Sequence, residues 1–228
     1  MATAAPIQTD TFTGFTPEAI QFLVDLADNN DRAWFNPRKA EYERLLKRPL
    51  EALCVALDER FKARDIPLEA DPARSPFRIY RDVRFAKDKS PYKTHISASF
   101  AYVGGNPHGG GYFHFQPGEM HIGGGLWRPE PATLAAFRRL VDKGEGLEPL
   151  DDQGFVAAFG GIHGEALTRV PQGYAKDHPR AELLKLKGLG VSFPKIPSTV
   201  RFSPRLAGWL AARSAEAAPV VSWLEEKL

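Results

Sequence analysis

The segment YFHFQPGEMHIG, residues 112–123, decides how we expect this chain to fold. Two runs of alternating apolar and polar residues flank Pro117 and Gly118, a pair suited to the two central positions of a type II turn. A two-residue turn fixes the register of a hairpin, and here it predicts that His114 lies directly opposite His121. The other face of the hairpin should meet the core, because it carries Phe113, Phe115, Met120 and Ile122.

The two opposed imidazoles are candidate catalytic residues. Directly opposed side chains have Cβ atoms roughly 4.5–5.5 Å apart, so His114 and His121 could share a proton, bind an anion when one ring is charged, or ligate a metal. A metal lacks a firm third ligand, since Glu119 lies on the diagonal and His108 on a loop, and we therefore assign none. The alternative is a polar cross-strand pair on an open sheet face.

A second segment, SPFRIYRDVRFAKDKSPYKTHISASF at residues 75–100, interleaves cationic and aromatic residues. Its alternation predicts a half-buried strand over residues 77–85, a loop over residues 86–91 and a further strand from about Ile96. Arg81 falls on the apolar side of the first strand, where an unpaired charge is very costly. It should therefore reach the sheet edge or an acidic partner other than Asp82.

The cations of this segment are candidate ligand-binding residues. Arginine offers a planar fork and lysine a mobile point charge, and together they suit the oxygens of phosphate or carboxylate. A solvated strand face, with charges balanced by Asp82 and Asp88, is the simpler alternative. The candidates are Arg78, Arg81, Arg84, Lys89 and Lys93, with Tyr92 beside them.

The composition is that of a globular protein. Of the 228 residues, 43% are hydrophobic and 25% are charged, and the formal net charge is +2. This near balance gives no global electrostatic reason to bind nucleic acid or a membrane surface, so any basic patch must be local. A chain of this length can form one core, and we expect a single domain over residues 1–228, with residues 1–12 as a flexible tail.

The single cysteine, Cys54, excludes an intramolecular disulfide. It lies in an apolar helical pattern, which predicts a buried thiol. The first residues have neither the cationic start nor the apolar core of a secretory signal, and no segment approaches the roughly 20 apolar residues of a membrane span. We therefore expect a cytoplasmic protein.

Helical patterns surround the expected strands. Thr16 and Pro17 predict the start of a helix that runs to about Asp28. Its buried side should carry Ile20, Leu23, Val24 and Ala27. Helices are also expected from residues 36 and 49, and then from residues 131, 151, 181, 204 and 219.

The order of the elements predicts the fold class. We expect four strands between Pro76 and Trp127, a glycine-rich loop over residues 104–111 and a last strand over residues 191–193. Helices at both ends of the chain then imply an α+β fold. Its central, mostly antiparallel sheet should be covered by helices from the N- and C-terminal segments.

The cationic segment also resembles the signature of a widespread bacterial family called domain of unknown function 2461. The resemblance rests on FRI at residues 77–79, RD at 81–82, RF at 84–85, DK at 88–89 and PYK at 91–93. It extends over Phe15 to Leu224, through Tyr112, Pro117, Gly123–Gly125, Trp127 and Pro129, and through PQGY at 171–174 and HP at 178–179. The loop over residues 106–111 departs from the pattern. The resemblance implies a soluble, full-length domain and no established catalytic residues.

These patterns favour a site that binds or transforms an anionic small molecule, with the cations as clamps and His114 and His121 exchanging protons. No hydrolase triad, metalloprotease motif or deaminase motif is present, so the sequence identifies neither a reaction nor a cofactor. A nucleic-acid- or protein-binding module and a purely structural charged network are the alternatives, and the near-neutral charge counts against nucleic acid. The preferred hypothesis requires the arginine row and the histidine pair to line one hollow.

Overall fold

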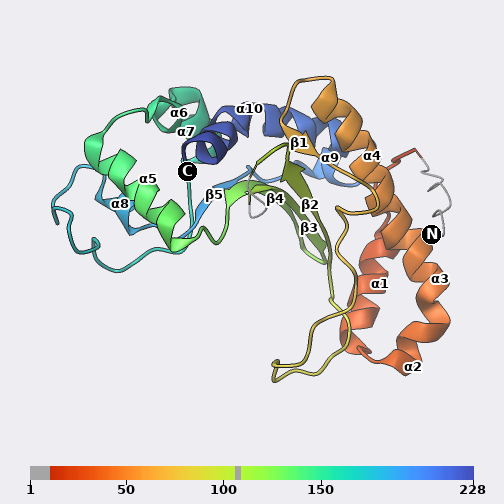
Figure 1. The fold of residues 1–228 in the computed structure, drawn as a ribbon. Helices are drawn as coiled ribbons and strands as arrows, with labels where there is room; N and C mark the ends of the chain where they lie inside the picture. The colour runs from red at the N-terminus through yellow and green to blue at the C-terminus, as the bar shows by residue number, and fades with distance from the viewer. Residues whose placement is uncertain (1–10, 106–108) are drawn as a thin grey trace, which may run out of the picture.

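The computed structural model describes residues 11–105 and 109–228, and within them five strands form one antiparallel sheet. The strands lie next to one another in the order in which they occur along the chain. Helices come before the first strand and after the last strand in the sequence (Figure 1). The predicted α+β fold is therefore confirmed. The strands are β1 (Leu68–Glu69), β2 (Ile96–Tyr102), β3 (Gly110–Gln116), β4 (Glu119–Leu126) and β5 (Leu189–Ser192).

The β3–β4 hairpin forms in the predicted register. His114 pairs with His121, and Gln116 pairs with Glu119 across the turn. Gly118 has a φ of 79°, the left-handed value that the second central position of a type II turn requires. As predicted, the residues of the apolar face are buried: Phe113, Phe115, Met120 and Ile122.

The predicted end of the loop over residues 104–111 is wrong. Strand β3 already begins at Gly110, which pairs with Ala101. A Cβ added to Gly110 would lie 2.1 Å from the carbonyl oxygen of Phe100. Glycine therefore lets the two backbones approach here, and it extends the strand instead of ending it. Residues 106–108, which include the candidate ligand His108, lie outside the described residues.

Residues 75–95, here called the arm, replace the strand expected over residues 77–85 (Figure 1, the yellow loop that extends below the sheet). The arm is an irregular hairpin with isolated bridges between Pro76 and Ala98 and between Tyr80 and Tyr92. Beyond these bridges the alternating side chains have no neighbouring strand to pack on, and Phe85 is 96% exposed. The four strands expected before Trp127 are thus three, and β1 and β5 come from outside that range.

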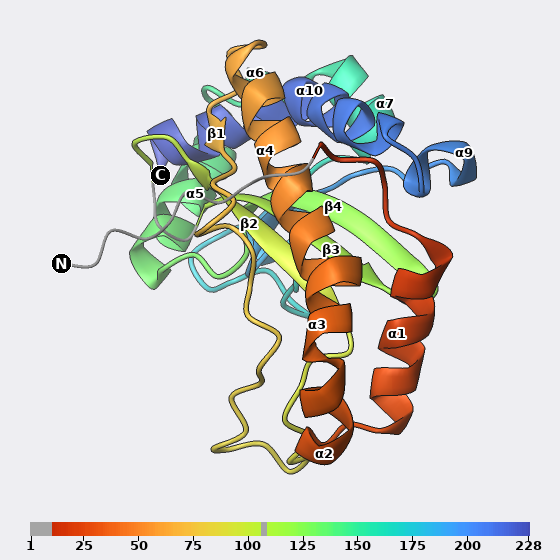
Figure 2. The ribbon, with the colours of Figure 1, turned by 90° about the vertical axis from the view of Figure 1, so that its right-hand side faces the viewer.

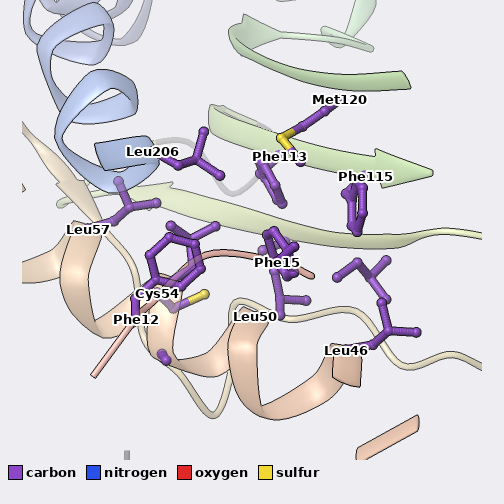
Figure 3. Close-up of a cluster of buried hydrophobic side chains, with 14 of the residues drawn as sticks. Phe12, Phe15, Leu46, Leu50, Cys54, Leu57, Phe113, Phe115, Met120 and Leu206 are labelled. Atoms are coloured by element: carbon purple, nitrogen blue, oxygen red, sulfur yellow. The ribbon is translucent and has the colours of Figure 1, made fainter. Parts of the chain in front are cut away.

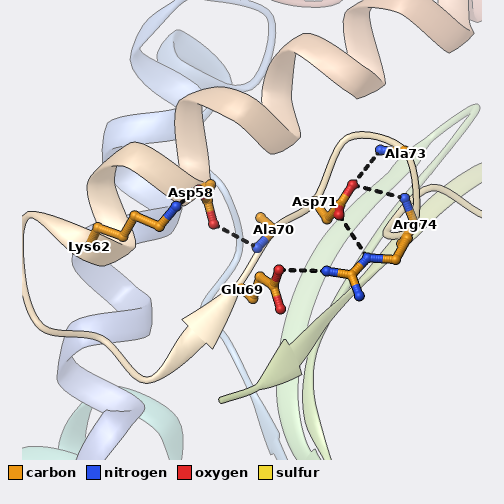
Figure 4. A network of polar contacts seen from close by, with 7 residues as sticks. All are labelled: Asp58, Lys62, Glu69, Ala70, Asp71, Ala73 and Arg74. Carbon is orange, nitrogen blue, oxygen red and sulfur yellow. Dashed lines mark hydrogen bonds and ion pairs between the residues drawn. The ribbon is translucent and has the colours of Figure 1, made fainter. Parts of the chain in front are cut away.

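Polar contacts hold the turn that leads into the arm (Figure 4). The carboxylate of Asp58 accepts a hydrogen bond from the backbone N–H of Ala70 at 3.2 Å. The guanidinium of Arg74 donates to Asp71 at 2.7 Å and to Glu69 at 2.6 Å. These contacts fix the base of the arm beside the helix that carries Asp58.

The first helix, α1, begins at Pro17 as predicted, but a helical turn that was not predicted, α2, begins at Arg32, where the Asp31 side chain accepts a hydrogen bond from the backbone N–H of Trp34. The buried side of α1 also differs, since its buried residues are Ala19, Phe22, Leu23 and Leu26. Val24 and Ala27 are exposed, and the ring of Phe22 packs against Trp34. The elements are α1 (Pro17–Asp28), α2 (Arg32–Phe35), η1 (Asn36–Arg38), α3 (Lys39–Tyr42), the π-helical turn η2 (Glu43–Lys47) and α4 (Arg48–Lys62).

The C-terminal helices include one more correction. Pro219 does not start a helix but lies inside the long helix α10. A proline there removes a backbone hydrogen bond, and the buried side chains of Val220, Val221 and Leu224 hold the helix together beyond it. The elements are α5 (Pro131–Lys143), α6 (Glu148–Asp151), α7 (Gln153–Phe159), α8 (Ala181–Lys185), α9 (Ser198–Arg201) and α10 (Arg205–Lys227).

The first apolar cluster lies between the sheet and helices α1, α4 and α10 (Figures 1 to 3). The ring of Phe15 stacks on that of Phe115 with centroids 4.8 Å apart, and it lies 6.1 Å from that of Phe113. Burial raises the pKa of the Cys54 thiol to about 12, which confirms the predicted buried thiol. Phe12 is also buried in this cluster, while residues 1–10 of the expected tail lie outside the described residues.

A second apolar cluster lies at the other end of the sheet. It joins β5 to α5, α7, α8 and the C-terminal half of α10, and it includes Phe137, Leu189 and Trp223. Tyr102 and Phe193 pack against both clusters. In the described part of the chain, no helix has the length and apolar character needed to cross a bilayer.

Candidate functional site

The sheet face opposite the first cluster, here called the open face, carries two neighbouring cross-strand rows. One row contains Ser97, His114 and His121. The other contains Ser99, Tyr112, Gly123 and Ser192. His121, Ser99 and Ser192 are exposed, so solvent and ligands can reach this face.

Three imidazoles lie next to one another here, two of them in the first row. The rings of His114 and His121 stack, with centroids 4.8 Å apart and an angle of 11° between their planes. On the other side of His114, the ring of His95 lies at 4.4 Å and is tilted by 32°. His95 is not among the residues that the sequence predicted for the site. Its alternation with Ser97 was a signal, but the loop between β2 and β3 is too long for the sequence to fix their register.

The protonation of this stack follows from its surroundings. Burial, with the neighbouring His114 and Lys93, lowers the pKa of His95 to about 4. Burial also lowers the pKa of His114, against a hydrogen bond to the Gln116 side chain that raises it. The Tyr112 hydroxyl lies 3.1 Å from Nδ1 of His114. His95 and His114 are therefore neutral imidazoles near pH 7.

The open end of the stack is held by a carboxylate. Nδ1 of His121 lies 3.0 Å from Oε1 of Glu119. The other oxygen of Glu119 accepts a hydrogen bond from the Gln116 side chain at 2.6 Å. Glu119 thus orients the most exposed of the three rings.

Aromatic side chains and one lysine surround the stack. The ring of Tyr112 lies 6.1 Å from His114 and from His121, and 6.3 Å from Phe77 of the arm. The ammonium of Lys93 lies 5.2 Å from the centre of the Phe77 ring. Burial, followed by the charge of Arg78, lowers the pKa of Lys93. An anion bound beside this ammonium would compensate for both effects.

Trp127 borders the opposite side of the open face. A Cβ added to Gly123 or Gly190 would lie 3.2 Å or 3.1 Å from atoms of its indole ring. The absence of side chains in the glycine segment thus allows the indole to lie close to the backbones of β4 and β5. Trp127 is nevertheless 49% exposed, so part of its ring system is available for contact with a ligand.

Three of the predicted cations make their contacts within the arm. Arg81 pairs with Asp88 at 2.5 Å, which confirms a partner other than Asp82. Arg84 pairs instead with Asp82 at 2.7 Å. The ammonium of Lys89 donates to the carbonyl oxygen of Val83 at 3.0 Å. A ligand-binding role for Arg81, Arg84 and Lys89 stays a prediction.

Tyr92 and Arg78 lie on the helix side of the arm. Tyr92 is 2% exposed, and its ring stacks on Phe35 with centroids 4.1 Å apart. The Asn30 side chain bonds both backbone groups of Tyr92, at 2.9 and 3.0 Å. Arg78 lines a hollow beside α3 and η2. Among the predicted site residues, the structure therefore brings only Lys93, His114 and His121 together on the open face.

Within the described ranges, no group of three or more histidine, cysteine, aspartate or glutamate side chains could hold a metal ion. The three neighbouring rings face one another, whereas ligands of one metal point their nitrogen lone pairs at a common centre. The chemistry that this arrangement can perform is proton exchange, together with stacking and anion contact.

A comparison with models of protein families finds one match, described as a conserved hypothetical protein of the family DUF2461, over residues 18–223. No curated protein and no solved structure matches the chain. The matched range includes the arm, the open face and Trp127.

Proposed function

The chain belongs to the DUF2461 family of conserved hypothetical proteins, and from the open face that lies within the matched range we propose that it binds an anionic small molecule with a planar ring. His114 and His121 exchange protons with this ligand. Lys93 contacts its anionic group.

The observation that carries the proposal is the stack of imidazoles between aromatic walls and beside a lysine. The nearly parallel rings of His114 and His121 form a flat polar surface. A neutral imidazole can accept a proton near neutral pH, which makes it suited to acid–base work on a bound ligand. His121 is the ring that a ligand reaches first, because it is exposed and stands at the end of the stack.

The aromatic side chains support a planar ring in the ligand. Phe77 is 45% exposed and Trp127 is 49% exposed, and they lie at opposite borders of the open face. Exposed rings of this size gain free energy when they stack on another ring. Lys93 supports the anionic group, since its ammonium is partly desolvated and lies next to Phe77.

The proposal is tested with phenyl phosphate as the probe, measured by the melting temperature and by isothermal titration. We expect it to stabilise the wild type, because a ligand that binds only the native state raises the free energy of unfolding. Lys93→Ala should abolish most of this stabilisation. Lys176→Ala, at an exposed lysine between α7 and α8, is the matched control and should bind as the wild type does.

Equal stabilisation of Lys93→Ala and wild type, or no stabilisation of either, would contradict the proposal. A fluorescent single-stranded oligonucleotide provides the comparison with the nucleic-acid alternative. Tight binding that weakens steeply with salt would support that alternative instead.

A further inference from the structure

We propose a second binding site, for a small phosphate or carboxylate on a short apolar body, in the hollow between the arm and the helical segment α3–η2. The hollow has a volume of about 250 Å³. It lies just below the usual size range of ligand pockets, roughly 300–1,000 Å³, so it suits a ligand of a few heavy atoms.

The charge of the hollow is mainly positive. Lys39 of α3, Lys47 of η2 and Arg78 of the arm line it, and Glu43 is the acidic residue among its lining side chains. Lys47 also lies 3.7 Å from Glu51, a distance typical of a weak contact. Cations from segments about thirty to forty residues apart in sequence therefore surround one concave surface.

The spacing along the helical segment explains why these side chains face the arm. Lys39, Glu43 and Lys47 are four residues apart, which places them in one row along a helix. The row ends in the π-helical turn η2. Such turns have wider hydrogen-bonded rings than an α-helix and are frequent at functional sites.

The floor of the hollow suits the apolar part of a ligand. Phe35 and Ile79 are buried there, and Tyr42 is 8% exposed. Burial raises the pKa of the Tyr42 phenol to about 12, so the phenol stays protonated at neutral pH. Tyr80 contributes a second phenol at the exposed rim. Phenols and cations above an apolar floor match a small organic anion better than a bare ion.

This site does not depend on the proposed function. None of the residues that line the hollow belongs to the open face, and Phe77 and Arg78 are successive residues whose side chains lie in different surroundings. The charge of Arg78 nevertheless lowers the pKa of Lys93, so the second site is removed alone by replacing Lys39 and Lys47.

The experiment measures binding of inorganic phosphate, propyl phosphate and butyrate by isothermal titration. We expect propyl phosphate or butyrate to bind more tightly than inorganic phosphate, because only these fill the apolar floor. In the double variant Lys39→Gln, Lys47→Gln the affinity should fall roughly tenfold or more, since two charge-assisted contacts are lost. The control Arg64→Gln, Lys176→Gln removes two exposed cations elsewhere and should bind as the wild type does.

The comparison of propyl phosphate with butyrate shows whether the site prefers a phosphate or a carboxylate. Equal affinity in the double variant and its control would overturn the proposal, as would no binding of any probe to the wild type. Lys93→Ala should leave this binding unchanged. Loss of propyl phosphate binding in Lys93→Ala, with binding kept in the double variant, would assign the probe to the open face and refute the second site.

Discussion

Among the three neighbouring imidazoles, His95 is the one whose pKa folding changes most clearly. Its pKa is about 4 in the folded protein, against 6.5 for an ordinary histidine. Between these values the unfolded chain binds more protons than the native state, so the free energy of unfolding decreases as the pH falls from 6.5 toward 4. The neighbouring His114, whose pKa is also lowered, acts in the same direction.

We predict that His95→Gln is less sensitive to acid than the wild type in this pH range. Glutamine cannot take up a proton, so the variant loses less stability between pH 7 and pH 4.5. Urea unfolding at both pH values measures the difference. The paired carboxylates of Asp82 and Asp88 contribute little to the change in stability between pH 7 and pH 4.5. Their pKa values are lowered from 3.8, so they take up protons below this pH range. Identical pH dependence in both proteins would show that the stack is not responsible.

Gly118 shows how one residue can determine the hairpin. No heavy atom lies within 4 Å of a Cβ added there, so the cost of a side chain is only that of its positive φ. We predict that Gly118→Ala lowers the free energy of unfolding by about 1–2 kcal/mol, while Gly118→Asn costs clearly less because asparagine tolerates the left-handed conformation. Chemical denaturation of the two variants measures this order. An equal cost would argue against a left-handed residue in the turn.

Among the elements, we expect the stability of the arm to depend more on the burial of Tyr92 than on its charges. The ion pair between Arg81 and Asp88 spans the arm near its tip, where Asp88 is exposed. Exposed pairs contribute about 0–1 kcal/mol. Tyr92 instead stacks on Phe35 and is bonded through its backbone by Asn30.

We therefore predict that Arg81→Ala lowers the free energy of unfolding by less than about 1 kcal/mol, and Tyr92→Ala by about 3–5 kcal/mol. Urea denaturation measures both. Hydrogen exchange at the backbone N–H of Arg81, which donates to the carbonyl of Pro91, reports whether the arm itself opens. A large cost for Arg81→Ala would favour the hypothesis that the charged residues form a purely structural network.

For the whole molecule, the two apolar clusters raise the question of whether the chain unfolds as one unit. The sheet and helix α10 take part in both clusters, and Tyr102 and Phe193 pack against each. Elements shared in this way make the clusters depend on each other. The structure thus supports our proposal of a single domain.

We predict that Phe15→Ala, in the first cluster, and Phe137→Ala, in the second, each cost about 3–5 kcal/mol, because both rings are buried. Each variant should still unfold in one transition. Circular dichroism and tryptophan fluorescence, recorded together during denaturation, test this. Two separate transitions in Phe137→Ala would show that the C-terminal cluster is an independent unit.

Local patterns in the sequence were enough to predict the features that depend on neighbouring residues. The Pro117–Gly118 turn set the register that places His114 opposite His121, and the pattern around Cys54 indicated a buried helix. An acidic partner of Arg81 other than Asp82 was also predicted and is present, although the strand that this prediction assumed does not form. These predictions succeed because turn geometry and side-chain periodicity act over a few residues.

The way in which distant segments meet became clear from the folded chain. The fold added His95 to the stack, laid the Trp127 indole on Gly123 and Gly190, and brought Arg78 beside Lys39. It also left the arm without the neighbouring strand that its alternation predicted. The physical reason is that these contacts depend on the paths of the loops and on the packing of the helices, which no local pattern of residues encodes.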